Sequence, residues 1–109
     1  MSSFNFSVMV VESKQPGLVV KLIGELDQLT VRELKSRLEE LEAGKAPRLV
    51  FDLAELEFMA SAGLSIFAFY HELFQKNCQG QTMKLINVSS GVMRVFKLTR
   101  MDEIISVSE

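Results

Sequence analysis

The sequence has few of the residues that disulfides, metal sites or membrane spans require. Its 109 residues include one cysteine, one histidine, two prolines and no tryptophan. The single Cys78 excludes an internal disulfide and a multi-cysteine metal site, and it fits a reducing compartment. No apolar run approaches the roughly 20 residues that a membrane-spanning helix needs. The N-terminal residues show no basic segment followed by an apolar core, so we expect a cytoplasmic protein without a secretory signal.

Charge of one sign is not in excess either. Twelve basic and 14 acidic side chains give a formal net charge of −2 and a pI near 5.5. This balance argues against a general nucleic-acid binder, because no basic stripe can replace the counterions of the phosphates. Hydrophobic residues make up 48% of the chain, which at this length predicts one soluble domain, residues 1–109, with its own core.

Hydrophobic periodicity predicts the order strand, strand, helix, strand, helix, strand, helix, strand. The expected strands lie near residues 4–10, 18–23, 48–53, 82–88 and 102–107, and the expected helices near residues 30–43, 63–77 and 89–99. The first two strands flank Pro16 and Gly17, a turn signal, and should form an antiparallel hairpin. Strands joined by helices should pair in parallel. The predicted fold is therefore α/β, a mainly parallel central sheet with an antiparallel N-terminal hairpin and helices packed on the sheet.

Local signals mark both ends of the first predicted helix. Thr30 and Glu33 form a capping-box pattern, in which each side chain serves the backbone amide of the other. Gly44 is the expected left-handed stop, and Pro47 confirms that the helix has ended.

The candidate functional site lies in residues 51–65, where a buried strand is followed by a connection and a turn of small residues. The turn consists of Ala60, Ser61, Ala62 and Gly63. Its lack of side-chain bulk should leave backbone amides open at the start of the next helix, where the helix dipole favours negative charge. A serine held there is well placed to carry a phosphate. It is equally well placed to be covered by a partner, so Ser61 is the candidate functional residue, and a plain helix cap is the alternative.

Four motifs in this order point to a family. They are Gly-Glu-Leu-Asp at residues 24–27, Leu-Val-Phe-Asp-Leu at 49–53, Phe-Met-Ala-Ser-Ala-Gly-Leu at 58–64 and Val-Phe-Lys-Leu-Thr-Arg-Met-Asp-Glu-Ile-Ile at 95–105. Over nearly the whole chain the sequence resembles STAS domains of the small bacterial anti-sigma-factor antagonist type. The resemblance implies that Ser61 is the phosphoacceptor. It also implies two partners, an anti-sigma factor that is a serine kinase and binds the unmodified domain, and a phosphatase that resets it.

Two positions in the turn depart from the family's pattern. Ala60 stands where the family has aspartate, and Ala62 where it has serine or threonine. Asp27 and Asp52 match family acids outside the turn and are expected near it, with helix capping or solvation of a strand end as the alternative role. Because the switch motif is incomplete, the alternative function is a constitutive STAS scaffold or partner-binding domain that has lost the phospho-switch.

An enzyme is not expected. The only histidine, His71, follows Ser61 by ten residues on the same predicted helix, roughly 15 Å along its axis and beyond hydrogen-bond reach. The glycines never cluster into a phosphate-binding motif, so no cofactor is predicted.

Three residues are predicted to form a partner surface beside the turn. Phe69 projects next to the polar strip of its helix, and the alternative for it is a ring half-covered by a neighbouring loop. Met93 and Lys97 are expected to share the outer face of the last helix.

Overall fold

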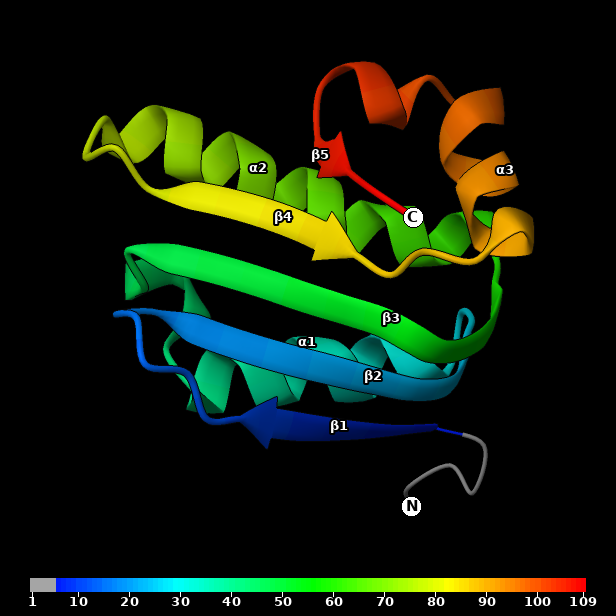
Figure 1. Ribbon diagram of the computed structural model, residues 1–109, viewed down its shortest axis with the longest axis horizontal. Coiled ribbons are helices and arrows are strands. Elements are labelled where there is room, and N and C mark those ends of the chain that lie inside the picture. Colours follow the sequence, from blue (N-terminus) through cyan, green and yellow to red (C-terminus); the bar gives the residue numbers. More distant parts are fainter. Residues whose placement is uncertain (1–5) are drawn as a thin grey trace.

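The computed structural model describes residues 6–109 as a five-stranded mixed sheet with helices on one face (Figure 1). The strands are β1 (Phe6–Val11), β2 (Leu18–Leu26), β3 (Arg48–Met59), β4 (Thr82–Ile86) and β5 (Ser106–Val107). The helices are α1 (Thr30–Glu40), α2 (Leu64–Asn77) and α3 (Ser90–Leu98), with 3-10 turns η1 (Ala43–Lys45), η2 (Ser61–Gly63) and η3 (Met101–Glu103). In the view of Figure 1, α1 and α2 lie behind the sheet and the front face is open.

The predicted element order and strand pairing are confirmed. The sheet order is β1-β2-β3-β4-β5, with β1 antiparallel to β2 and every other neighbouring pair parallel. The hairpin turn requires glycine, because Gly17 has φ +133° and a Cβ there would lie 2.5 Å from the Arg48 carbonyl oxygen. The part of the first predicted strand that contains Phe4 lies outside the described residues.

The core between the sheet and the helices contains a cluster of three aromatic rings from β3, α2 and α3. The rings of Phe51 on β3 and Phe67 on α2 meet edge to face with centroids 5.0 Å apart, and Phe96 on α3 lies 5.9 Å from Phe67. All three side chains are fully buried. Burying one such side chain contributes about 1.5–3 kcal/mol, so this contact holds both helices firmly to β3.

The central strand is longer than predicted. β3 runs unbroken to Met59, because four of its last residues pair in parallel with the end of β2 across two register irregularities. These four residues are Glu55, Leu56, Phe58 and Met59. The small-residue turn therefore follows the strand directly. The prediction that this strand ends near residue 53 is therefore wrong, because pairing with β2 extends the strand to Met59.

The end of α1 also differs from the prediction. Glu42, with φ 54°, is the left-handed residue, whereas Gly44 lies inside η1. Gly44 packs closely against α2, since a Cβ there would lie 3.0 Å from the side chain of Leu73.

Two classes of structure are absent from residues 6–109. Every helix in this range is too short or too polar to span a bilayer. The same residues contain no group of three or more histidine, cysteine, aspartate or glutamate side chains placed to hold a metal ion.

Candidate functional site

The small-residue turn packs directly on the end of β2. The amide of Ala60 donates to the carbonyl of Leu26 at 2.9 Å, and the amide of Gly63 donates to the carbonyl of Ala60 at 2.9 Å. A Cβ on Gly63 would lie 2.9 Å from the Leu26 side chain and 3.1 Å from that of Met59. Glycine at this position lets the turn approach β2 closely, which holds Ser61 at the carboxyl end of β3.

Ser61 is exposed, with Ala60 and Ala62 half-buried on either side. It does not cap α2, because the cap position belongs to Gly63, which has no side chain to offer. The amides of Gly63 and Leu64 already donate within the turn, so the expectation of open amides is wrong for these two. The amides of Ser61 and Ala62 precede the first hydrogen bond of the turn and remain for solvent or a ligand.

Asp27 directly follows the last residue of β2, which pairs with Met59, and its carboxylate accepts backbone amides at the start of α1. Its Oδ1 accepts the amides of Leu29 and Thr30, both at 2.9 Å. The amide of Thr30, followed by that of Leu29, lowers the pKa of the Asp27 carboxyl, although burial opposes this. The capping alternative for Asp27 is therefore the one that the structure supports.

The predicted capping box does not form around the Thr30 hydroxyl. Thr30 is the first residue of α1 and Leu29 holds the cap position. The Thr30 hydroxyl points back toward the sheet, accepting from the amide of Asp27 at 2.8 Å and donating to the carbonyl of Glu25 at 2.7 Å. Its side chain is 2% exposed, so this hydroxyl ties the end of β2 to the start of α1 from within the protein.

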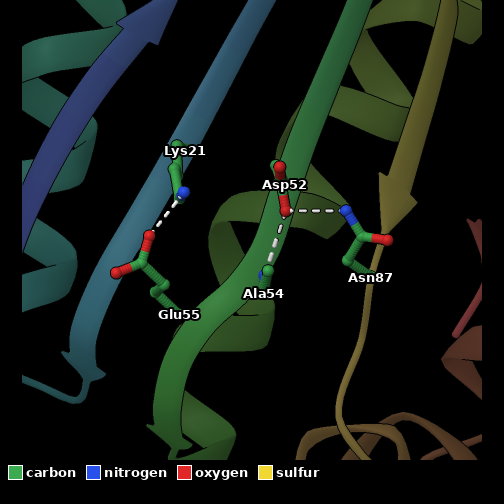
Figure 2. A network of polar contacts seen from close by, with 5 residues as sticks. All are labelled: Lys21, Asp52, Ala54, Glu55 and Asn87. Atoms are coloured by element: carbon green, nitrogen blue, oxygen red, sulfur yellow. Dashed lines mark hydrogen bonds and ion pairs between the residues drawn. The ribbon is translucent and has the colours of Figure 1, made fainter.

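Asp52 does not lie near Ser61. It sits in the middle of β3, eight residues before Ala60, which is on the order of 25 Å along the strand. Successive side chains of a strand point to opposite faces, so the Asp52 carboxylate lies on the face away from the buried Phe51. In Figure 2 its Oδ1 accepts from the Ala54 amide at 3.0 Å and from Asn87 Nδ2 at 3.1 Å. Asp52 therefore bridges β3 to the end of β4. The prediction failed because the strand continues past the acid.

A second polar contact lies next to Asp52 on the same open face. Lys21 on β2 forms an ion pair with Glu55 on β3, and Glu55 raises the pKa of the Lys21 ammonium (Figure 2). An ion pair as exposed as this one adds little to stability. The Lys21–Glu55 pair and Asp52 thus belong to the surface of the sheet and not to the serine turn.

The three predicted partner residues differ in exposure. Phe69 is 55% exposed and Lys97 is exposed, whereas Met93 is only 7% exposed and belongs to the core. The prediction of an outward-facing Met93 is therefore wrong. Because α3 docks along the sheet end with Val92, Met93 and Phe96 all turned inward, its apolar face is wider than the sequence suggested.

Sequence reasoning missed the contribution of α1 to this end of the molecule. Arg32 and Lys35 on α1 line one groove together with Ser65 and Phe69 on α2. The available signal was the spacing of Arg32, Lys35 and Glu39, which places three charges along one side of the helix.

Fold and site define a small α/β domain with an exposed serine turn where β3 ends and α2 begins. Residues 7–109 match the STAS domain family, and the chain belongs to that family.

Named relatives are similar over most of their length. The chain is 30% identical over 98 residues to the anti-sigma-B factor antagonist of Bacillus subtilis, covering 90% of this chain and 87% of the relative. The crystal structure of an anti-sigma factor antagonist from Mycobacterium paratuberculosis matches with a TM-score of 0.77 at 26% identity, covering 99% of this chain and 90% of the other. These relatives are named as regulators, in agreement with the prediction of a non-enzymatic protein.

SpoIIAA from Bacillus is a further structural match, and it has been solved in two states. The unphosphorylated form matches with a TM-score of 0.74 at 18% identity, covering 94% of this chain and 89% of that one. The phosphorylated form matches with a TM-score of 0.68 at 17% identity, covering 94% and 92%. At this identity the match shows a shared fold.

Proposed function

We propose that this STAS protein is a cytoplasmic anti-sigma-factor antagonist whose binding to an anti-sigma factor is switched by phosphorylation of Ser61. The observation that carries the proposal is an exposed serine in a turn between β3 and α2 that backbone hydrogen bonds tie to β2. Family membership and the names of the relatives support the partner class. The anti-sigma factor acts also as the serine kinase, and a phosphatase restores the unmodified state.

The modification consists of a single phosphoryl transfer. Ser61 Oγ forms a bond to the γ-phosphorus of ATP held by the kinase, while the bond from that phosphorus to the bridging oxygen breaks. ADP leaves, and the hydroxyl proton passes to a base of the kinase. The phosphate adds about 1.5–2 negative charges at neutral pH. Because Ser61 is exposed and its turn is fixed, this charge changes docking without refolding the domain.

A constitutive binding domain is the second candidate, and the position of Asp27 favours it. The family's aspartate beside the acceptor serine is Ala60 here. Asp27 is the acid next to the turn, but its Oδ1 already accepts two amides of α1 and does not replace the missing carboxylate. In this alternative the domain binds its partner equally with and without ATP.

Phosphorylation assays separate the two candidates. The purified chain is incubated with ATP and each serine-kinase anti-sigma factor of the source organism, and the phosphosite is mapped by mass spectrometry. The switch predicts phosphate on Ser61, its loss in Ser61→Ala and its retention in Ser90→Ala, a control at an exposed serine that begins α3, outside the serine turn and the groove between α1 and α2. Binding without modification under any condition favours the constitutive domain. Phosphate confined to another residue contradicts the assignment of Ser61.

A further inference from the structure

A groove of about 250 Å³ lies between α1 and α2. Its lining residues are Val31, Arg32, Lys35, Glu39, Ser65, Ile66, Phe69 and Tyr70. The two helices follow β2 and β3, which are parallel, so both begin at the same end of the sheet and run side by side behind it (Figure 1). One end of the groove is therefore the end that carries Ser61.

The wall of the groove formed by α2 is apolar and partly uncovered. Phe69 is 55% exposed and meets the buried Tyr70 edge to face, with ring centroids 5.2 Å apart. Ile66 is buried beneath them. A rigid aromatic ring at the rim of an apolar groove is the type of residue that dominates binding energy in protein interfaces.

The wall formed by α1 has a charge gradient along the groove. Arg32 and Lys35 lie in the first turns of α1, at the Ser61 end, and Glu39 lies about 10 Å further along the helix axis than Arg32. Within residues 6–109 neither cation forms an ion pair. Glu39 acts on the far end, where its charge adds to the effect of burial in raising the pKa of Tyr70.

We propose that this groove binds an amphipathic helix of the partner protein, with apolar side chains against Phe69 and carboxylates toward Arg32 and Lys35. Two parallel helices form a trough that suits a third helix, and the unpaired cations set the charge that it must carry at the Ser61 end. The proposal rests on the proposed function in one respect: a phosphate on Ser61 competes with the partner's carboxylates for these cations and repels them. Binding of a helix in the groove does not itself require that Ser61 be phosphorylated or that the partner have kinase activity.

A model peptide tests the contact directly. The probe is a 16-residue amphipathic helix with a leucine stripe and three glutamates in its first two turns, titrated into the ¹⁵N-labelled chain and followed by NMR. We expect shift changes concentrated in residues 31–39 of α1 and 65–70 of α2. The Arg32→Glu/Lys35→Glu variant should bind at least tenfold more weakly, and so should Phe69→Ala.

Matched variants separate the groove from general effects. Lys76→Glu/Lys84→Glu makes the same change in net charge at exposed positions outside the groove, and Phe58→Ala removes a ring that is 50% exposed on β3. Both should bind the peptide within twofold of the unchanged chain. Equal losses in the groove variants and these controls would overturn the proposal. NMR shift changes confined to other parts of the chain, or no shift changes at millimolar peptide, would also overturn it. So would shift changes in the groove that depend on the concentration of the chain in the absence of peptide, because they indicate that a second copy of the chain is the occupant.

The kinase that phosphorylates Ser61 provides a second readout. If it modifies Ser61 but binds the Arg32→Glu/Lys35→Glu variant as tightly as the unchanged chain, the groove proposal fails while the proposed function stands. If no kinase modifies Ser61, the proposed function fails and the peptide titration still decides the groove. If the kinase modifies Ser61 and binds Arg32→Glu/Lys35→Glu at least tenfold more weakly, with no loss of affinity for Lys76→Glu/Lys84→Glu, the result supports both the groove proposal and the proposed function.

Discussion

The starts of α1 and α2 lie at the same end of the sheet but differ in how side chains contribute to their hydrogen bonding. At α1 the Asp27 carboxylate accepts two backbone amides, and the buried Thr30 hydroxyl joins the helix to the end of β2. At α2 the first residue of the turn is Ala60, which has no acceptor side chain, and Ser61 is exposed. One helix start is closed by its own side chains, while the other leaves a hydroxyl for a group outside the chain.

The difference indicates which polar residues serve the fold and which are left for function. A polar side chain that is buried and fully hydrogen-bonded, such as Thr30, is accounted for by the fold alone. An exposed serine in a turn that close packing has fixed has no such role. Thr30 and Ser61 carry hydroxyls at neighbouring helix starts, and we expect opposite effects of mutation. Loss of the Thr30 hydroxyl should lower stability, whereas modification of Ser61 should change binding.

The largest effect on stability is expected at Thr30. Thr30→Val keeps the shape of the side chain but leaves the Asp27 amide and the Glu25 carbonyl without their partner, which should lower the free energy of unfolding by about 2 kcal/mol. Urea denaturation measures this. Thr82→Val, at an exposed position on β4, is the control and should stay within about 0.5 kcal/mol. Equal stability of the two variants would show that the Thr30 hydroxyl does not close the start of α1.

A smaller loss is expected at Gly63. The methyl group of Gly63→Ala would meet the Leu26 and Met59 side chains, and overpacking of this kind should cost about 1.5 kcal/mol. Gly91→Ala, near the start of α3 with nothing within 4 Å of the added Cβ, should leave stability unchanged or slightly raised. If urea denaturation finds both variants equally stable, the turn is not held against β2 as described.

Closing the second helix start should stabilise the protein. Ala60 has φ −81° and ψ 161°, the extended conformation of a cap residue. Ala60→Asp should therefore accept an amide of the turn and raise the free energy of unfolding by about 0.5–1 kcal/mol at pH 7. Ala54→Asp adds the same charge at an exposed position of β3 and should give no gain. A loss of stability in Ala60→Asp would mean that the turn excludes a carboxylate.

The smallest effect concerns pH. Because the pKa of Asp27 lies below its ordinary value of 3.8 in the folded chain, its stabilising contribution is complete above that pH and is lost as the pH falls through the folded pKa. The Tm of Asp27→Asn should therefore be lower than that of the unchanged chain at pH 7, with the gap narrowing below pH 3.8. NMR titration of the Asp27 carboxyl supplies the pKa directly. A gap that persists unchanged at pH 2 would contradict the capping role.

Periodicity and turn residues predicted the element order and strand pairing because these depend on local patterns that the fold preserves. The position of Asp52 depended instead on how far β3 continues, which pairing with the end of β2 decides. The burial of Met93 depended on how a short helix docks, and the role of the Thr30 hydroxyl on a contact with Glu25 across a turn. The turn that contains the exposed Ser61 could be singled out because a run of small residues before an apolar helix is visible in the sequence itself, and the role of Ser61 stays a prediction.

The affinity of the proposed partner kinase for the two states of Ser61 tests the central claim most directly. Isothermal titration calorimetry would compare the unmodified chain with the chain phosphorylated at Ser61. We expect the phosphate to weaken binding at least 30-fold, since losing one well-packed contact costs about 2 kcal/mol. Affinities that agree within twofold would show that Ser61 is not a switch.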